Sequence, residues 1–194
     1  MIKIDCFDIT KLRAGDYDRL YGLASSDRRA RADRYPRQED KIRCICADAM
    51  LRQALGRDCC FGYGEQGKPY LLDGEGLHFN LSHSGRWVVL AYGSGPVGVD
   101  VEQKRTGDLD SIAKRFFNPD EQSFVQSNPE MFFRIWTGKE SYLKYLGTGL
   151  TTPLNSFSVL EDLGVNLFFV SLEDACLTLC TREQEYTLRF LEEL

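Results

Sequence analysis

The chain has 194 residues, of which 43% are hydrophobic and 27% charged, so it is long enough to bury a real core. Its formal net charge of −5 argues against a nucleic-acid surface as its main function, and no apolar run approaches the length of a membrane span. The N-terminus lacks the apolar segment of a signal peptide, so we expect a cytoplasmic protein whose seven cysteines are reduced thiols.

The first half of the chain predicts one strand, two helices and then a series of short strands. Residues 2–7 alternate well enough to form the first strand. Ser25 or Ser26 can cap a short Arg-rich helix that Pro36 ends. Apolar residues at helical spacing predict a longer helix over residues 40–55. Short strands separated by glycine-rich turns are expected near residues 70–72, 79–81, 87–92 and 97–101.

The second half repeats this order of helices followed by strands. The segment Asn118-Pro119-Asp120-Glu121 is a strong helix start, with Asn as the cap, Pro at the first helical position and Glu three residues after the cap. Another helix is expected to begin at Asn128-Pro129, to run to about Tyr145 and to end at Gly147. Strands are expected near residues 157–160, 167–170, 177–181 and 186–190.

This order predicts an α+β fold of two similar lobes. Each lobe would be a long helix packed on a small, mainly antiparallel sheet, and the two would be related by a pseudo-two-fold axis. We expect the N-terminal lobe over residues 1–102 and the C-terminal lobe over residues 103–194. No repeat in the sequence itself demonstrates a duplication.

Two carboxylates stand out in the run Val97-Gly98-Val99-Asp100-Val101-Glu102. The period of two predicts a strand on which Asp100 and Glu102 share one face. Carboxylates about 7 Å apart repel one another unless something positive lies between them. A hard divalent cation such as Mg²⁺ fits that position, because it takes oxygen ligands. A half-exposed strand with two solvated acids is the alternative, and this stretch alone leaves both open.

A third carboxylate lies on the helix expected before residue 145. Phe132, Trp136, Glu140 and Lys144 are spaced by four and therefore share one helical face. A Glu–Lys pair at this spacing is common on surfaces and contributes only about 0.3–0.5 kcal/mol. Here the pair shares its face with two large aromatics, which should be buried or line a cleft. If Glu140 faces the two strand carboxylates, the three converge as a divalent cation site would need.

Groups suited to phosphate gather in the first half. The segment from Arg28 to Arg43 is rich in Arg and Lys, which on an acidic protein suits a small phosphate-bearing ligand better than a polymer. Ser82-His83-Ser84 supplies hydroxyls and an imidazole at the end of an apolar strand, although a structural role for His83 is equally open. Gly67-Lys68-Pro69 offers another ammonium, but it is not a P-loop because Pro69 replaces the hydroxyl residue.

The order of these motifs is more specific than any one of them. A basic helix, then GKP, FNLSHSG, GVDVE, FFNPDE and WTGKESYLK, resembles the 4′-phosphopantetheinyl transferases, specifically the Sfp-type group of pseudo-dimeric single chains. The resemblance runs from about Arg28 to Val159. It implies an enzyme that moves the 4′-phosphopantetheine arm of coenzyme A onto a serine of an apo acyl or peptidyl carrier protein, releasing adenosine 3′,5′-bisphosphate. It also implies Mg²⁺, a monomer, an active site between the lobes and a typical link to secondary metabolite biosynthesis.

The resemblance also assigns roles to individual residues. Asp100, Glu102 and Glu140 are implied as Mg²⁺ ligands, and Glu140 also as the base that activates the carrier serine. Lys144 is implied to contact the α-phosphate and to assist the departing bisphosphate. The chain departs from the family at Thr148, where the family often places Lys, so one basic contact is lost. The 3′-phosphate and adenine end of coenzyme A is assigned to Arg31, Lys68, Ser82 and His83, with Arg28 and Arg43 in the same region.

Two other functions remain as alternatives. A coenzyme A-binding module without catalysis is disfavoured by the intact acids, since a pure binder has no need for three of them. A metal-dependent nucleotide phosphohydrolase accounts for the acids and cations but gives no reason for the GKP and SHS motifs. Neither a nucleic acid nor a membrane is expected as a partner, because the chain lacks an exposed series of aromatic and basic residues and a membrane span.

Overall fold

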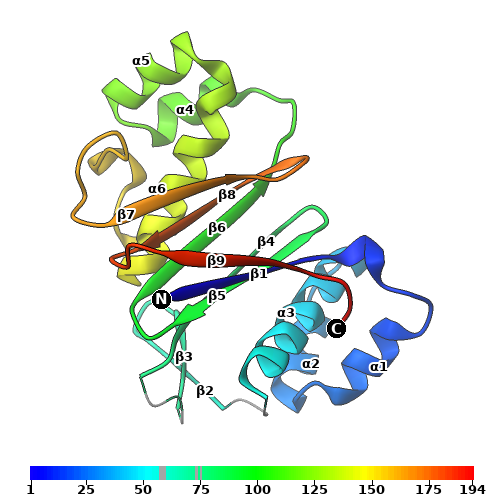
Figure 1. The fold of residues 1–194 in the computed structure, drawn as a ribbon. Coiled ribbons are helices and arrows are strands. Elements are labelled where there is room, and N and C mark those ends of the chain that lie inside the picture. Colours follow the sequence, from blue (N-terminus) through cyan, green and yellow to red (C-terminus); the bar gives the residue numbers. More distant parts are fainter. Residues whose placement is uncertain (57–59, 73, 75) are drawn as a thin grey trace.

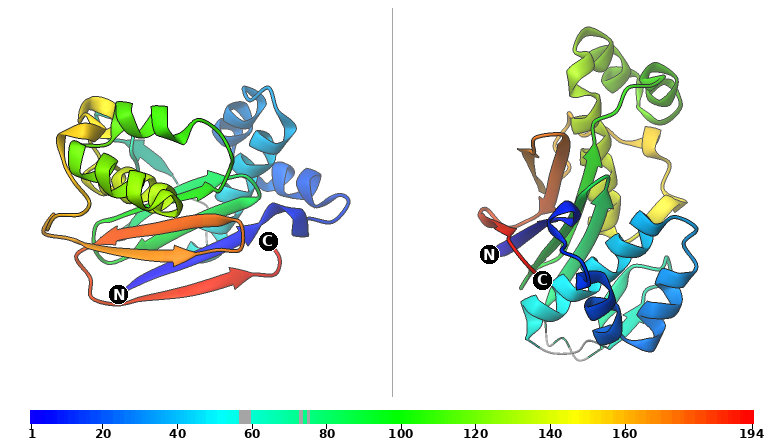
Figure 2. Two further views of the ribbon diagram at one scale, coloured as in Figure 1. Left: turned by 90° about the horizontal axis from the view of Figure 1, so that it is seen from above. Right: turned by 90° about the vertical axis from the view of Figure 1, so that its right-hand side faces the viewer.

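The structure, a computed structural model, describes residues 1–56, 60–72, 74 and 76–194. Its sheets lie between two groups of helices, one formed by α1–α3 and the other by α4–α6 (Figure 1, Figure 2). This arrangement confirms the predicted α+β class. The helices are α1 (Asp16–Leu23), α2 (Ser26–Asp33), α3 (Gln38–Leu55), α4 (Leu109–Phe116), α5 (Pro119–Ser127) and α6 (Phe132–Leu146), with short 3₁₀ turns at Ile9–Lys11, Pro129–Met131, Gly149–Thr151 and Leu154–Ser156.

Most strands pair in an antiparallel manner, as expected. One sheet has the strand order β4-β5-β1-β9, a second has the order β6-β8-β7, and β2 and β3 form a separate hairpin. Of the described pairings, the one between β1 and β9 is parallel. The strands are β1 (Ile2–Asp8), β2 (Phe61–Tyr63), β3 (Pro69–Leu71), β4 (His78–Ser84), β5 (Trp87–Gly93), β6 (Val97–Gln103), β7 (Asn166–Ser171), β8 (Ala175–Thr181) and β9 (Tyr186–Leu191).

The chain crosses between the two larger sheets twice. β6 follows β5 directly but belongs to the second sheet, and β9 returns to the first sheet, where Tyr186 pairs with Ile2 and Leu191 with Phe7. Both sheets therefore draw strands from each side of residue 102. The division into lobes over residues 1–102 and 103–194 stays a prediction.

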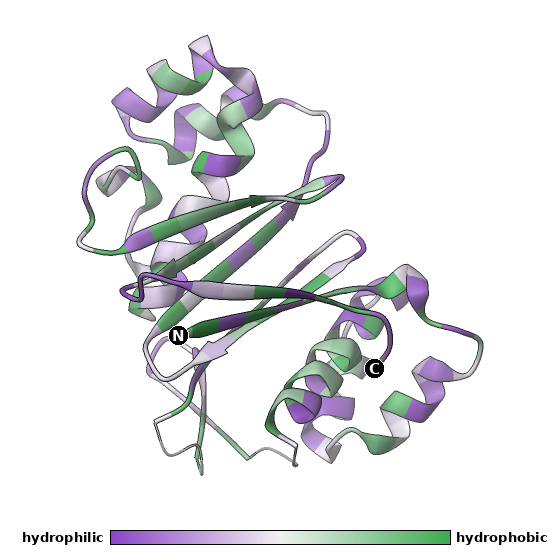
Figure 3. Ribbon diagram, viewed as in Figure 1, coloured by the Kyte–Doolittle hydropathy of each residue, from purple (hydrophilic) through white to green (hydrophobic). Residues whose placement is uncertain are grey.

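Alternation along the strands sorts the side chains into two main cores. Ile2 and Ile4 of β1 enter a core shared by the two sheets, whereas Phe7 enters the core under α1–α3. Every second residue of β6, from Val97 to Val101, also enters the shared core. Asp100 and Glu102 consequently lie on the opposite face of β6, and Figure 3 shows this alternation as bands along the strand.

Two expected elements differ from the structure. The strand expected near residues 157–160 is wrong, because those residues form a bend and a turn. Their backbone pairs with side chains instead: Lys139 Nζ donates to the Phe157 carbonyl at 2.6 Å, and the Val159 N–H donates to Glu121 Oε1 at 2.8 Å. The helix expected from Asn128 starts as a 3₁₀ turn, and α6 itself begins at Phe132.

Several further features bear on the predictions. Three short elements, α1, α4 and β2, were not anticipated from the sequence. The six described cysteines are free thiols, and Cys59 lies outside the described residues. Among the helices that the structure describes, none combines the length and the apolar character needed to cross a bilayer.

Candidate functional site

Asp100 lies at the centre of a bonded group formed by β4, β6 and α6. Its side chain is buried, and Oδ1 accepts hydrogen bonds from Lys144 Nζ at 2.6 Å and from Ser82 Oγ at 2.9 Å. Lys144 Nζ also lies 3.0 Å from Ser82 Oγ. Three elements that are distant in sequence therefore meet at one carboxylate. We call Asp100, Glu102 and Glu140 the acid cluster.

A glycine contact lets α6 approach β6 closely enough to build this group. A Cβ atom on Gly98 would overlap the Ser141 carbonyl and the Tyr145 backbone of α6. On the neighbouring strand, the hydroxyls of Thr137 and Thr178 lie 2.7 Å apart, which fixes α6 over β8 as well. The helical face that carries Glu140 is thus pressed against the strand that carries the other two acids.

The carboxylates of the acid cluster interact electrostatically with one another. Burial, with repulsion from Asp100 next in size, raises the pKa of Glu140 above its usual value, and Lys144 opposes this shift. Burial also raises the pKa of Glu102; the hydrogen bond from Ser84 opposes the shift and Asp100 adds to it. Burial is therefore the main cause of both pKa shifts, and repulsion from Asp100 contributes to each.

The donor chemistry of the acid cluster fits Mg²⁺. Asp100 Oδ2 is buried and has no hydrogen-bond partner among the described residues, while Oδ1 is taken by Lys144 and Ser82. Carboxylate oxygens are the ligands that Mg²⁺ prefers. In the part of the chain that the structure describes, however, no three acidic, histidine or cysteine side chains are gathered as a formed metal site. The fit is therefore one of residue type and of a free carboxylate oxygen.

Across β4 from the acid cluster lies a cavity of about 160 Å³, which we call the arginine cavity. Arg28 and Arg31 of α2 line it together with His83 of β4. Ser82 and His83 are neighbours in one strand, so their side chains point to opposite faces. Strand alternation thus sends Ser82 to Asp100 and His83 to the arginines.

The ring of His83 links the two sides electrostatically. Burial lowers its pKa below the usual value, and repulsion from Arg43 and Lys144 adds to the effect. The ring is therefore neutral at neutral pH. Because Lys144 also bonds to Asp100, the acid cluster and the arginine cavity adjoin each other at this strand.

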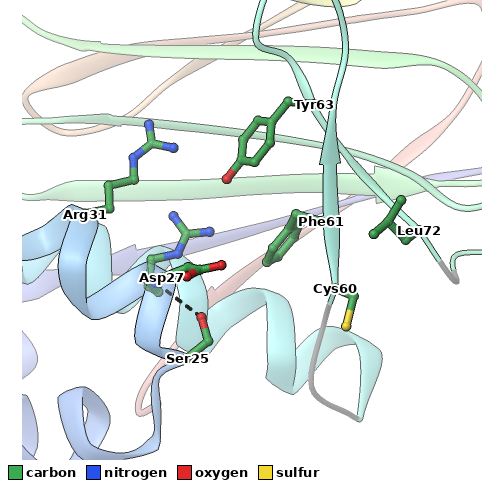
Figure 4. A pocket seen from close by; sticks show the side chains of 8 residues that line it. Ser25, Asp27, Arg31, Cys60, Phe61, Tyr63 and Leu72 are labelled. Atoms are coloured by element: carbon green, nitrogen blue, oxygen red, sulfur yellow. Dashed lines mark hydrogen bonds between the residues drawn. The ribbon is translucent and has the colours of Figure 1, made fainter.

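A second cavity of about 260 Å³, the outer cavity, shares both arginines with the first. Figure 4 shows Ser25, Asp27 and Arg31 on its α2 side, and Phe61 and Tyr63 of β2 opposite them. The Arg28 guanidinium lies 5.6 Å from the centre of the Phe61 ring, a distance suited to a cation–π contact. The two cavities together offer cations and aromatic surface, the groups that a phosphorylated heteroaromatic ligand needs.

Two of the predicted phosphate contacts are already bound within the protein. Arg28 Nε lies 3.3 Å from buried Asp48. Arg43 bonds to Asp40 at 2.6 Å and donates to the Gly85 carbonyl at 2.5 Å, which ties α3 to the β4–β5 turn. Arg43 therefore holds the hairpin that carries His83.

Lys68 lies apart from the arginine cavity. Its Nζ donates to the Val97 carbonyl at 3.1 Å and to the Tyr145 carbonyl at 3.2 Å, and burial lowers its pKa to about 8. The neighbours Gly67 and Pro69 line the arginine cavity, whereas Lys68 lines a different one of about 320 Å³. The structure thus brings Arg28, Arg31 and His83 together and leaves Lys68 outside that group.

Comparison with known proteins identifies the family. Residues 96–190 match the 4′-phosphopantetheinyl transferase superfamily, and a 4′-phosphopantetheinyl transferase of Bacillus subtilis is 42% identical over 166 residues, covering 79% of this chain and 74% of that protein. The chain belongs to the 4′-phosphopantetheinyl transferase superfamily. 4′-Phosphopantetheinyl transferase Sfp of Bacillus subtilis (strain 168) is 37% identical, covering 73% of this chain and 68% of that relative. The transferase HetI of a Nostoc species is 41% identical, covering 68% and 62%. The resemblance to Sfp-type transferases is thereby confirmed.

The structure of this superfamily member shows contacts that the sequence does not reveal. In the sequence Gly98 is one position of an alternating strand pattern, and that pattern does not predict its close contact with α6. Glu121 forms the predicted capping box with Asn118. It also pairs with Lys139 at 2.7 Å, and both side chains are fully buried. A Lys inside an aromatic-rich helix was the available signal for that pair.

Proposed function

We propose that this chain transfers 4′-phosphopantetheine from coenzyme A to a serine of an apo acyl or peptidyl carrier protein. The observation that carries the proposal is the placement of the acid cluster and the arginine cavity on two sides of β4, with Ser82 facing one and His83 the other. Coenzyme A has phosphate in two places, at the 3′ position and in its diphosphate. A protein that binds coenzyme A therefore needs two adjoining regions that neutralise phosphate charge, one for the 3′-phosphate and one for the diphosphate.

The cationic region would hold the nucleotide end. We assign the 3′-phosphate and the adenine to Arg28, Arg31 and His83, because their side chains line one cavity. Cations and imidazole suit phosphate oxygens. Arg43 and Lys68 stay in the proposal as further contacts, although the present bonds of both side chains hold them to other parts of the protein.

The acid cluster would hold the metal. Asp100, Glu102 and Glu140 are the proposed ligands, and the unpartnered Oδ2 of Asp100 supports that assignment. Mg²⁺ bound there would neutralise phosphate charge and align the diphosphate for transfer. Ser82 would keep Asp100 oriented through its bond to Oδ1.

The transfer itself needs one proton acceptor and one stabiliser of negative charge. The carrier serine oxygen forms a bond to the phosphorus that bears the pantetheine arm, and the phosphoanhydride bond of coenzyme A breaks. We assign the serine proton to Glu140, directly or through a water molecule, because a carboxylate held beside the reacting phosphate can accept it. The bond electrons leave with adenosine 3′,5′-bisphosphate, whose new charge lies beside the Lys144 ammonium.

The proposal extends to the architecture. We propose that the chain acts as a monomer whose two lobes are related by a pseudo-two-fold axis, with the active site between them. In support, α3 packs against β5 of one sheet and α6 against β6 and β8 of the other, so a long helix lies on each larger sheet.

The test is the intact mass of several apo carrier proteins incubated with this protein, coenzyme A and Mg²⁺. We expect one carrier at least to gain the mass of a single phosphopantetheine. Glu140→Gln should lower the rate by at least about 100-fold, the contribution usual for a general base. Glu130→Gln makes the same charge change at an exposed site next to α6 and should transfer normally.

The outcomes separate the alternatives. Loss of the mass gain on removing Mg²⁺ with a chelator would support the metal assignment. Normal transfer by Glu140→Gln would refute the role of Glu140. Coenzyme A binding without transfer to any carrier would indicate a non-catalytic binding module, and release of bisphosphate without a carrier would indicate a phosphohydrolase.

A further inference from the structure

The two larger sheets meet at a seam that has an unusual bonding pattern. β4 is an edge strand of the first sheet and β6 is an edge strand of the second. Side chains of β4 accept hydrogen bonds from the backbone of β6. The acceptors are Asn80 Oδ1 for the Val99 N–H at 2.8 Å, Ser82 Oγ for the Val101 N–H at 3.2 Å and Ser84 Oγ for the Gln103 N–H at 3.1 Å.

The sequence explains why these three residues lie at the seam. They alternate along β4 and so share one face, while Phe79 and Leu81 point to the helix-covered core. The N–H groups of alternate residues along a strand point to the same edge, and β8 already pairs with the other edge of β6. The three polar side chains therefore take the place of a backbone ladder for one edge of β6.

Two of the three side chains do more than accept a bond. Ser82 also donates to Asp100, and Ser84 donates to Glu102 Oε2 at 2.6 Å. Each of these pairs is separated by 18 residues in the sequence. The same offset from Asn80 leads to Gly98, which has no side chain. Asn80 thus accepts a backbone hydrogen bond from β6 as the two serines do, but the residue 18 positions later, Gly98, offers it no carboxylate.

We propose that Ser84 is a positioning residue that fixes Glu102 in the acid cluster. A hydroxyl has one proton to donate. Because Ser84 Oγ accepts from the Gln103 N–H, its proton is directed away from that backbone and toward Glu102. The carboxylate is thereby tied to the backbone of its own strand. This inference rests on the proposed function, in which Glu102 is a metal ligand.

Glu102 needs such a tie more than Asp100 does. Asp100 is already held by Lys144 and Ser82, from two different elements. Glu102 has a longer side chain at the end of β6 and is only half-buried. A partner that orients a metal ligand typically contributes 10- to 100-fold to metal affinity. The loss of Ser84 should therefore lower the affinity for the metal more than it lowers the turnover of the metal-loaded enzyme.

The experiment measures Mn²⁺ binding to the full chain by the electron paramagnetic resonance signal of free Mn²⁺, without any carrier protein. We expect Ser84→Ala to weaken Mn²⁺ binding by about 10-fold and Ser84→Thr, which keeps the hydroxyl, to restore it. Asn80→Ala removes the matched backbone bond and should leave the Mn²⁺ affinity within about 2-fold of the original protein. Thermal unfolding of each variant measures the damage to the seam separately.

Steady-state transfer gives a second readout. Ser84→Ala should need about 10-fold more Mg²⁺ for half-maximal rate, with kcat at saturating Mg²⁺ and the KM for coenzyme A close to the original values. If Ser84→Ala does not fold, the nearly isosteric Ser84→Cys, whose thiol is a weaker donor, takes its place.

Each outcome decides the inference. Unchanged Mn²⁺ affinity in the Ser84 variant, in an enzyme that itself binds Mn²⁺ and transfers, overturns the positioning role alone. Equal weakening by Asn80→Ala and Ser84→Ala overturns it too, because the effect would then come from the seam in general. An original protein that neither binds Mn²⁺ nor modifies a carrier overturns the proposed function together with this inference.

Discussion

The arginine cavity and the acid cluster adjoin each other, yet their charges are balanced differently. On the arginine side the protein supplies its own counterions, since Arg28 lies beside Asp48 and Arg43 bonds to Asp40. On the acid side Lys144 neutralises Asp100, while burial and mutual repulsion raise the pKa values of Glu102 and Glu140. A phosphate in the arginine cavity would therefore share Arg28 with Asp48, whereas on the acid side Lys144 is bonded to Asp100 and burial disfavours the charged forms of Glu102 and Glu140.

The two sides are also anchored differently. The core around α3 is built from apolar side chains such as Ile45, Met50 and Leu51. The helix of the acid side is anchored by a buried ion pair, Lys139 with Glu121, and by the backbone contact at Gly98. A helix that must hold like charges close together needs such specific anchors. Substitutions at these anchors therefore test the comparison most directly.

The largest expected effect is on the buried ion pair. Lys139→Met leaves the Glu121 carboxylate without its counterion at a fully buried position. Breaking a buried pair in this way costs about 3–5 kcal/mol, and we expect the free energy of unfolding, measured in urea, to fall by that amount. Carrier modification should fall with it, since Lys139 precedes Glu140 on α6.

A double variant distinguishes the lost pairing from lost packing. Adding Glu121→Gln to Lys139→Met removes the stranded charge and keeps an oxygen for the bond from Val159. We expect the double variant to be more stable than Lys139→Met alone by at least about 1 kcal/mol. Strictly additive losses would contradict an electrostatic anchor.

The second expected effect is on the close approach of α6. Gly98→Ala places a methyl group against the Ser141 carbonyl and the Tyr145 backbone, which cannot rotate away as a side chain can. We expect a loss of about 1–3 kcal/mol in unfolding free energy and a marked fall in transfer, because Glu140 and Lys144 shift relative to Asp100. Gly22→Ala on α1, where a Cβ meets nothing within 4 Å, should be neutral or stabilising. Equal stability of the two variants would contradict the contact.

The residues found from the sequence are those whose neighbours are set by a local period. Asp100 with Glu102, and Glu140 with Lys144, share faces because strand and helix repeats fix them. The meeting of the two faces depends on Gly98, which no repeat reveals. Lys68 shows the same limit, since the residues on either side of it line the arginine cavity and its own side chain does not.

The wrong or missing predictions share a physical cause. Residues 157–160 are apolar enough for a strand, but buried Lys139 and Glu121 bind their backbone groups, and those partners are distant in sequence. The parallel pairing of β9 with β1 joins the two ends of the chain. The role of Ser84 depends on the seam between two sheets. Each is a long-range contact, and composition and spacing carry no information about such contacts.

The smallest effect we predict concerns the arginine side and its response to pH. Burial and the nearby cations lower the pKa of His83, so the free protein holds this ring neutral at pH 7. A phosphate brought into the arginine cavity opposes those cations and raises the pKa of the ring. Binding then takes up a proton, and the affinity for coenzyme A, relative to that of a variant without the ring, should rise by roughly 3- to 10-fold as the pH falls from 8 to 6.

Titration calorimetry measures the coenzyme A affinity of the original protein and of His83→Asn at several pH values, and the comparison shows the proton uptake that depends on His83. The ligand phosphates and every other group titrate in both proteins, so their contributions cancel in the ratio of the two affinities. A ratio that grows toward low pH places His83 beside the bound phosphate, and a ratio independent of pH removes it from the phosphate site.

The acid cluster should show the opposite pH dependence in its affinity for metal, because protons compete with the ion for Glu102 and Glu140, whose pKa values are raised. Lowering the pH would therefore favour phosphate binding in the arginine cavity through His83 and weaken metal binding at the acid cluster.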